Sequence, residues 1–86
     1  MNELNDYLRK MEALVKDDCK LHVPSFRYIR CYSYAVVSGN IEAHFDVAGA
    51  PNYLWLYDVI YIQQSNKFCT YRYRLEDTFV VDNVTE

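Results

Sequence analysis

The sequence predicts an α+β fold: one N-terminal helix packed on a four- to five-stranded antiparallel meander sheet, a two-layer sandwich. Apolar residues recur every three or four positions over residues 2–19, and after Pro24 the period changes to two. Turn-forming residues then divide the chain into short segments typical of strands. The chain has 86 residues, which suits a single domain (residues 1–86) with one compact core.

The helix is predicted from an apolar stripe opposite an acidic face. The stripe comprises Leu4, Tyr7, Leu8, Met11, Leu14, Val15 and Cys19. The acidic face comprises Glu3, Asp6, Glu12, Asp17 and Asp18. We interpret this face as solvated, and alternatively as a site for a basic protein. The helix is expected to end near Lys20, because the residue before Pro24 avoids helical geometry.

Period-two segments predict the strands. They cover residues 26–37, 41–48, 53–63 and 68–75, with a short fifth strand around Phe79–Val81. The separating turns are rich in Gly, Pro, Asn and Ser and cover residues 38–40, 49–52 and 65–67. Because one helix covers only one face of such a sheet, the face assignment of each strand decides which side chains are exposed.

The third strand, YLWLYDVIYI from Tyr53 to Ile62, places aliphatic residues at even positions and aromatic residues at most odd positions. We expect Leu54, Leu56, Ile60 and Ile62 to pack beneath the apolar helix stripe. Asp58 interrupts this row and is not explained by it. The turn before the fourth strand places Cys69, Tyr71, Tyr73 and Leu75 on the aliphatic face, and Thr70, Arg72 and Arg74 on the aromatic face.

The first hairpin has two possible registers. A three-residue loop, Ser38–Asn40, pairs Val37 with Ile41 and places Ile29, Cys31, Ala35 and Val37 under the helix. A two-residue loop inverts the first strand and buries its tyrosines, because a one-residue slip moves every side chain to the other face. We favour the longer loop, since the small residues Cys31, Ser33 and Ala35 allow a helix to approach closely.

The favoured register leaves a sheet face rich in Tyr, Trp and Arg, which are enriched at interface hot spots. The predicted partner-binding residues are Tyr28, Arg30, Tyr32, Tyr34, His44, Tyr53, Trp55, Tyr57, Tyr61, Arg72 and Arg74. So many exposed rings exceed the apolar area that a monomer normally leaves bare. The alternative is that they are ordinary sheet residues, partly covered by the segment around Phe79–Val81.

Chemistry-bearing motifs are sparse. One polar row projects from the second strand and comprises Glu42, His44 and Asp46. Such a row can bind a metal or position a general base, but it is more often a solvated strand face. With two glycines, the chain has no glycine-rich phosphate loop. We therefore predict no catalytic residues, no metal and no cofactor.

The cysteines and the N-terminus predict a cytoplasmic protein. Cys19, Cys31 and Cys69 are widely spaced and odd in number, so we expect reduced, mostly buried thiols. Residues 1–20 carry regularly spaced charges and no secretory signal. No apolar run approaches the length of a membrane span.

These features favour a non-enzymatic binding protein that occludes a protein partner, such as a larger enzyme or toxin. Toxin-immunity proteins and phage anti-defence inhibitors are of this type, and the same face is also suited to a homodimer. The alternative is a single-stranded nucleic-acid binder that stacks bases on Tyr and Trp. The net charge of −3 counts against nucleic acid. A small hydrolase using His44 is a third hypothesis.

Overall fold

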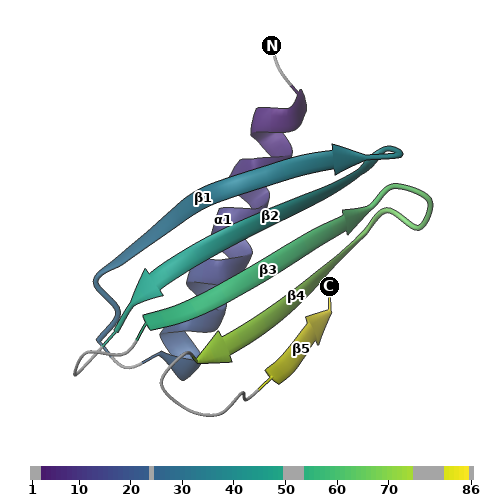
Figure 1. Ribbon diagram of the computed structural model, residues 1–86. Helices are drawn as coiled ribbons and strands as arrows, with labels where there is room; N and C mark the ends of the chain where they lie inside the picture. Colours follow the sequence, from purple (N-terminus) through teal and green to yellow (C-terminus); the bar gives the residue numbers. More distant parts are fainter. Residues whose placement is uncertain (1–2, 24, 50–53, 75–80, 86) are drawn as a thin grey trace.

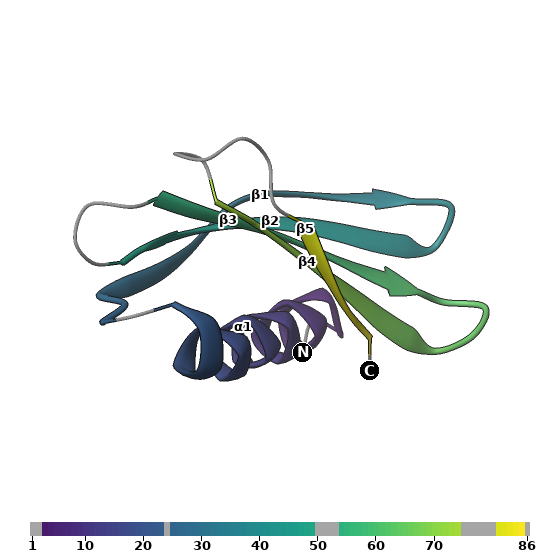
Figure 2. The ribbon, with the colours of Figure 1, turned by 90° about the horizontal axis from the view of Figure 1, so that it is seen from below.

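A computed structural model describes residues 3–23, 25–49, 54–74 and 81–85, and for Arg74 and residues 81–85 it describes the backbone alone. Helix α1 (Glu3–His22) lies across one face of a five-stranded antiparallel sheet of order β1-β2-β3-β4-β5 (Figures 1 and 2). The strands are β1 (Tyr28–Val37), β2 (Asn40–Ala48), β3 (Leu54–Ile62), β4 (Lys67–Arg74) and β5 (Val81–Thr85). The predicted two-layer α+β meander is confirmed.

Some predictions fall outside the described residues. They concern the turn after Gly49, the side chains of Tyr53 and Leu75, and Phe79 and Val80 of the expected last strand. Within the described residues, β5 begins at Val81 and pairs with β4.

Helix α1 buries the predicted apolar stripe. Met11, Val15 and Cys19 are fully buried, with the other stripe residues packed around them. The helix runs past Lys20 to His22, because the amide of Val23 still donates to the carbonyl oxygen of Cys19 at 2.9 Å.

The prediction of a solvated acidic face is wrong for one of its residues. Asp18 is buried, at 6% exposure, and is not solvated. It lies one residue before Cys19 and three after Val15, which places it on the edge of the buried stripe.

The sheet face beneath α1 carries a mixed apolar and aromatic core. Its buried residues are Ile41, Ala43, Phe45 and Val47 from β2, Trp55, Tyr57, Val59 and Tyr61 from β3, and Phe68, Thr70 and Arg72 from β4. The expected pairing of odd β3 positions with even β4 positions is confirmed, for example Tyr57 with Arg72.

The face assignment of β3 is wrong. Its even residues, which include Leu54 and Ile60, lie on the other side of the sheet and are only half-buried. The cause is the register with β2, which pairs Phe45 with Tyr57 and Ala43 with Val59. Directly opposite residues share a face, so the apolar row of β2 brings the aromatic row of β3 under the helix.

The first hairpin has the two-residue loop. Val37 pairs with Asn40, and Ser38 and Gly39 have φ angles of 53° and 84°, as a type I′ turn requires. The three-residue loop is therefore wrong, and Tyr34 and Val36 share the face of the buried β2 residues.

A register shift between Cys31 and Ser33 then reverses which positions of β1 face the helix, so that odd positions do so near the start of the strand. At this β-bulge, one extra residue stands on β1. Ile29 and Cys31 are thus on the helix side, as predicted, whereas Ala35 and Val37 are on the opposite side.

Candidate functional site

The sheet face opposite α1, called the open face below, has no described element packed on it (Figure 2). Its residues are Tyr28, Arg30, Tyr32, Ser33, Ala35 and Val37 from β1, Asn40, Glu42, His44, Asp46 and Ala48 from β2, Leu54, Leu56, Asp58, Ile60 and Ile62 from β3, and Lys67, Cys69, Tyr71 and Tyr73 from β4. Most of these side chains are half-buried by their neighbours in the sheet. The open face therefore combines aliphatic, tyrosine and charged groups.

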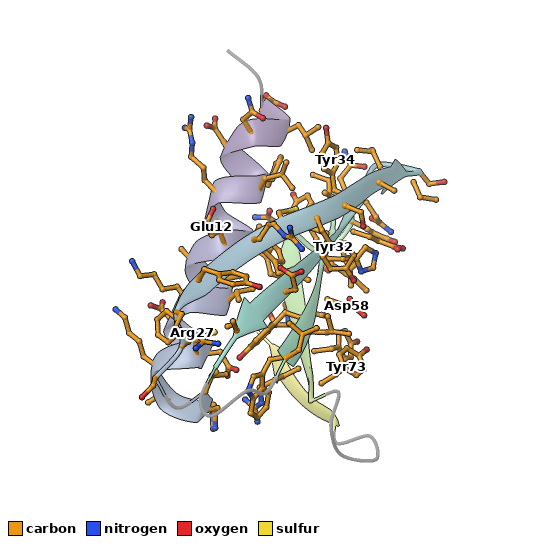
Figure 3. The ribbon with its side chains drawn as sticks, turned by 60° about the vertical axis from the view of Figure 1, so that its left-hand side comes forward. Glu12, Arg27, Tyr32, Tyr34, Asp58 and Tyr73 are labelled. Carbon is orange, nitrogen blue, oxygen red and sulfur yellow. The ribbon has the colours of Figure 1, made fainter. Side chains whose placement is uncertain are left out.

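A histidine–carboxylate pair lies at the middle of the open face. His44 Nδ1 is 2.6 Å from Asp58 Oδ1, and the ring centroids of Tyr32 and His44 are 6.1 Å apart. Tyr32, Asp58 and Tyr73 lie on the side of the sheet away from α1 (Figure 3). Partial burial, with Asp58 nearby, raises the pKa of both tyrosines. Asp58, unexplained in the sequence, is thus the acceptor of this cluster.

A second charged pair borders the first. The guanidinium of Arg30 donates from Nη2 to Asp46 Oδ2 at 2.6 Å and from Nε to Asp46 Oδ1 at 3.2 Å. These two bonds raise the pKa of Arg30. The guanidinium of Arg30 largely covers the carboxylate of Asp46. Asp46 therefore has a cationic partner, and Asp58 has the imidazole of His44.

The open face contains a row that resembles a catalytic triad in composition alone. Ser33 lies opposite His44, which lies opposite Asp58. A nucleophilic serine needs a hydrogen bond to its base, and no such bond joins Ser33 to His44 in the part of the chain described. The side chains of His44 and Asp58 are also 35% and 32% exposed on a sheet surface. This geometry supports an exposed polar pair better than a hydrolase.

The metal hypothesis for β2 is not supported either. His44 contacts Asp58 and Asp46 contacts Arg30, so two of the three expected ligands are directed to other partners. Among the described residues, no group of three or more His, Cys, Asp or Glu side chains is placed to hold a metal ion.

The predicted binding residues divide between the two faces. Tyr28, Arg30, Tyr32 and His44 are on the open face as predicted. Tyr34 is 52% exposed but on the helix side. The prediction of exposure is wrong for Trp55, Tyr57, Tyr61 and Arg72, which are buried beneath α1. The side chains of Tyr53 and Arg74 lie outside the described residues.

A buried polar cluster accommodates the polar groups of the row of β3 that faces the helix. The hydroxyl of Tyr57 donates to Asp18 Oδ2 at 2.5 Å, and Arg72 Nη1 donates to the same oxygen at 2.8 Å. The thiol of Cys19 lies 3.7 Å from the Tyr57 hydroxyl oxygen. A tyrosine is stable in a core when its hydroxyl has a partner, and Asp18 supplies one.

The thiol of Cys19 and the hydroxyl of Tyr57 keep their protons at neutral pH. Burial raises the pKa of Cys19 from 9.0 to about 11, and burial together with the bond to Asp18 raises the pKa of Tyr57. A protonated thiol is a poor nucleophile, which argues against cysteine chemistry in the hollow of about 400 Å³ beside the C-terminus of α1. The cluster was missed in the sequence, although the position of Asp18 beside the stripe was a usable signal.

The three cysteines are free thiols, as expected, but their burial differs from the prediction. Cys19 is buried, Cys69 is half-buried and Cys31 is exposed. Cys31 is exposed because it lies on the edge strand β1.

Helix α1 is too polar to serve as a membrane span, and no other described segment is a helix. The chain matches no protein-family model, no curated protein and no solved structure. Its functional interpretation therefore rests on the surface geometry given above.

Proposed function

We propose that the chain is a small, non-enzymatic, cytoplasmic protein-binding domain that occludes a larger protein through its open face. Inhibitors such as toxin-immunity proteins and phage anti-defence proteins act in this way. The supporting observation is that a complete sheet face has no described layer over it and has the composition of an interface. The surface differs from the one predicted, because β3 contributes aliphatic residues to it rather than Trp55 and Tyr57.

The composition of the open face fits a protein partner. Tyr28 and Tyr32 are 48% and 51% exposed, and the same face carries half-buried Leu56, Ile60 and Tyr73 on β3 and β4. Protein interfaces are enriched in tyrosine and arginine around an apolar centre, and their charged groups are paired. Arg30–Asp46 and His44–Asp58 are already paired, so a partner covers them without leaving a lone charge buried.

Binding of single-stranded nucleic acid is less well supported. Three of the aromatic rings and one of the arginines intended for it are in the core (Trp55, Tyr57, Tyr61 and Arg72). Arg30 is neutralised by Asp46, and the net charge is −3. Phosphate binding depends on clustered Lys and Arg, and on the described part of the open face the basic residues are Arg30, which is paired with Asp46, and Lys67, the first residue of β4.

Affinity capture with matched variants tests the proposed function. The tagged chain is incubated with lysate of its native host, captured proteins are quantified by mass spectrometry, and the main one is purified for affinity measurement. We expect Tyr32→Ser and Tyr73→Ser each to weaken that affinity roughly 10-fold or more, as is typical of hot-spot tyrosines. Leu21→Ser is the control, since Leu21 is 79% exposed on α1 and outside the open face.

Two outcomes overturn the proposal. One is a captured partner whose affinity is unchanged by both tyrosine substitutions, with circular dichroism confirming that the variants are folded. The other is salt-dependent binding of a labelled single-stranded oligonucleotide that both substitutions abolish, which transfers the open face to the nucleic-acid hypothesis.

A further inference from the structure

Strand β1 leaves its outer edge open to a further strand. It is ten residues long, it is the first strand in the sheet order, and among the described residues no strand lies beyond it. Among the side chains that the structure describes, the exposed large apolar ones other than Leu21 all belong to β1: Tyr28, Tyr32, Tyr34, Val36 and Val37. A long, apolar edge strand is a template for pairing with another chain.

The β-bulge divides this edge into two parts. Bulges twist an edge and discourage pairing, so the part from Tyr28 to Ser33 is protected. The remaining part, residues 33–37, follows a regular register and contains no charged residue and no proline. This segment, SYAVV, has none of the features by which proteins normally block an edge.

The hairpin geometry fixes which backbone groups of the segment point outward. The closing pair of a two-residue hairpin, here Val37 and Asn40, is hydrogen-bonded, and such pairs alternate along an antiparallel ladder. Ala35 is then bonded to Glu42, whereas the N–H and C=O groups of Tyr34 and Val36 point away from β2.

The side chains of Tyr34 and Val36 are exposed although they lie on the helix side. Their cross-strand neighbours, Ala43 and Ile41, are buried, but Tyr34 and Val36 are 52% and 57% exposed. The end of the β1–β2 hairpin extends beyond α1, so the helix does not cover this corner of the sheet (Figures 1 and 2).

We propose that a second copy of the chain pairs with residues 33–37 in antiparallel orientation, about a two-fold axis that is perpendicular to the sheet and passes between the two copies of Ala35. Tyr34 of each copy then lies opposite Val36 of the other, and their outward N–H and C=O groups bond to each other. The two sheets become one continuous sheet, and both helices lie on the same side of it.

Three features favour a second copy over a foreign strand. The segment is uncharged, so pairing brings no like charges together. The two-fold creates an aromatic–β-branched pair, Tyr34 with Val36, twice on the helix side, and such pairs stabilise antiparallel sheets. The paired segment ends at the same residues in both copies, because Ser33, next to the bulge of one chain, lies opposite Val37, next to the turn of the other. Arg30 stays outside the paired segment.

The interface is small. A half-exposed tyrosine contributes roughly 100 Å² of the 150–250 Å² that a tyrosine can bury. The segment thus falls below the area of about 800 Å² per partner in a standard interface. We therefore expect a weak dimer that forms and dissociates with concentration.

Sedimentation equilibrium over a concentration series tests the dimer. The weight-average mass of the native chain is expected to rise from one toward two chain masses. Val36→Lys places a charge at the paired edge and is expected to weaken association at least 10-fold. Leu21→Lys makes the same charge change on α1 and should associate like the native chain.

Cysteine crosslinking tests the register. In a Cys31→Ser background, Ala35→Cys places two thiols directly opposite each other across the axis, and it is expected to form an intermolecular disulfide at least 10-fold faster than Leu21→Cys. A single chain mass at all concentrations, equal association of Val36→Lys, or equal crosslinking rates would each overturn the dimer. Crosslinking of Ala35→Cys to a captured protein instead of itself assigns the edge to a foreign strand.

The two proposals fail separately. Val36→Lys removes the dimer and leaves the open face intact, so capture that depends on Tyr73 persists if the proposed function is right. Loss of capture in Tyr73→Ser, with dimerisation unchanged, supports both proposals at once. Dimerisation without any Tyr73-dependent capture overturns the proposed function alone.

Discussion

At the scale of the residue, Asp18 supplies the polar partner that the buried face of β3 requires. Its carboxylate accepts bonds from Tyr57 on β3 and Arg72 on β4, so one helix residue links α1 to two strands. Buried ion pairs add little net stability, because desolvation of the charges offsets their attraction. Removal of one partner of such a pair nevertheless lowers the free energy of unfolding strongly, because the other charge is left buried and unpaired. The pair therefore makes the orientation of the helix on the sheet specific.

Substitution of Asp18 tests this role. Asp18→Asn removes the negative charge that faces the buried guanidinium of Arg72, and we expect the free energy of unfolding to fall by about 3 kcal/mol. Urea denaturation measures the change. Asp17→Asn, on the neighbouring exposed position, is the matched control and should alter stability by no more than about 0.5 kcal/mol. Equal effects of the two substitutions would contradict the assigned role.

The same cluster predicts a loss of stability at alkaline pH. The pKa of Cys19 is raised from 9.0 to about 11 in the fold, so its contribution is complete below pH 9 and is lost as the pH rises to about 11. The raised pKa of Tyr57 acts in the same direction. We expect the free energy of unfolding to fall by about 2 kcal/mol over this range.

Urea denaturation at pH 8 to 11 measures this dependence. Cys19→Ala should be less stable at neutral pH and should show a shallower decline above pH 9, because the unfolded chain no longer gains from thiolate formation at this position. Cys31→Ala, at an exposed site, is the control and should keep most of the native slope. A native profile that is flat up to pH 11 would refute the prediction.

At the scale of the element, the turn between β1 and β2 determines the face of the adjoining part of β1. The loop contains only Ser38 and Gly39, and both have positive φ angles. Serine is a poor residue for the left-handed region, whereas asparagine and glycine tolerate it. The bulge near Tyr32 then reverses which positions face the helix: odd positions do so before the bulge, and even positions do so after it.

Substitutions in this turn are expected to change stability in opposite directions. Gly39→Ala forces a Cβ onto a residue with φ of 84°, and that Cβ meets Gln63 Oε1, so stability should fall by about 1 kcal/mol or more. Ser38→Asn suits the first position of a type I′ turn and should raise stability by about 0.5 kcal/mol. Thermal and urea denaturation of the three proteins measure both effects. A stabilising Gly39→Ala would mean that the loop has another conformation.

At the scale of the whole molecule, the helix layer covers less area than the sheet layer. Helix α1 covers the centre of the sheet, while the open face and the end of the β1–β2 hairpin lie beyond it (Figures 1 and 2). Strands β2 and β3 have a neighbour on each side, whereas β1 has one on its inner side. Backbone protection should therefore fall from the centre of the sheet to the β1 edge.

Amide hydrogen exchange measured by NMR tests this order. In dilute solution, the amides of Tyr34 and Val36 should exchange fast, because they point outward, and those of Phe45 and Tyr57 should exchange slowest. Raising the protein concentration should lower the exchange rates of the Tyr34 and Val36 amides in proportion to the fraction of chains that are dimeric. Slow exchange of these two amides in dilute solution would mean that another segment pairs with β1.

The sequence by itself determined the elements and their order. The apolar stripe of α1, the turns and the odd-to-even pairing of β3 with β4 follow from local periodicity and turn chemistry, and they need no knowledge of distant contacts. Part of the candidate surface, with Tyr28, Arg30, Tyr32 and His44, was also predictable. Only the tertiary structure decided which face of β3 the helix covers.

Both faces of β3 are apolar enough to be buried, so hydrophobicity does not distinguish them. Tyr57 lies inward in register with Phe45 of β2, and the helix brings Asp18 to its hydroxyl from a position far away in the sequence. Asp58 lies outward, where His44 of the neighbouring strand reaches it. The register with the apolar row of β2 and these polar partners together decide the face, and both exist only once the helix, β2, β3 and β4 have assembled.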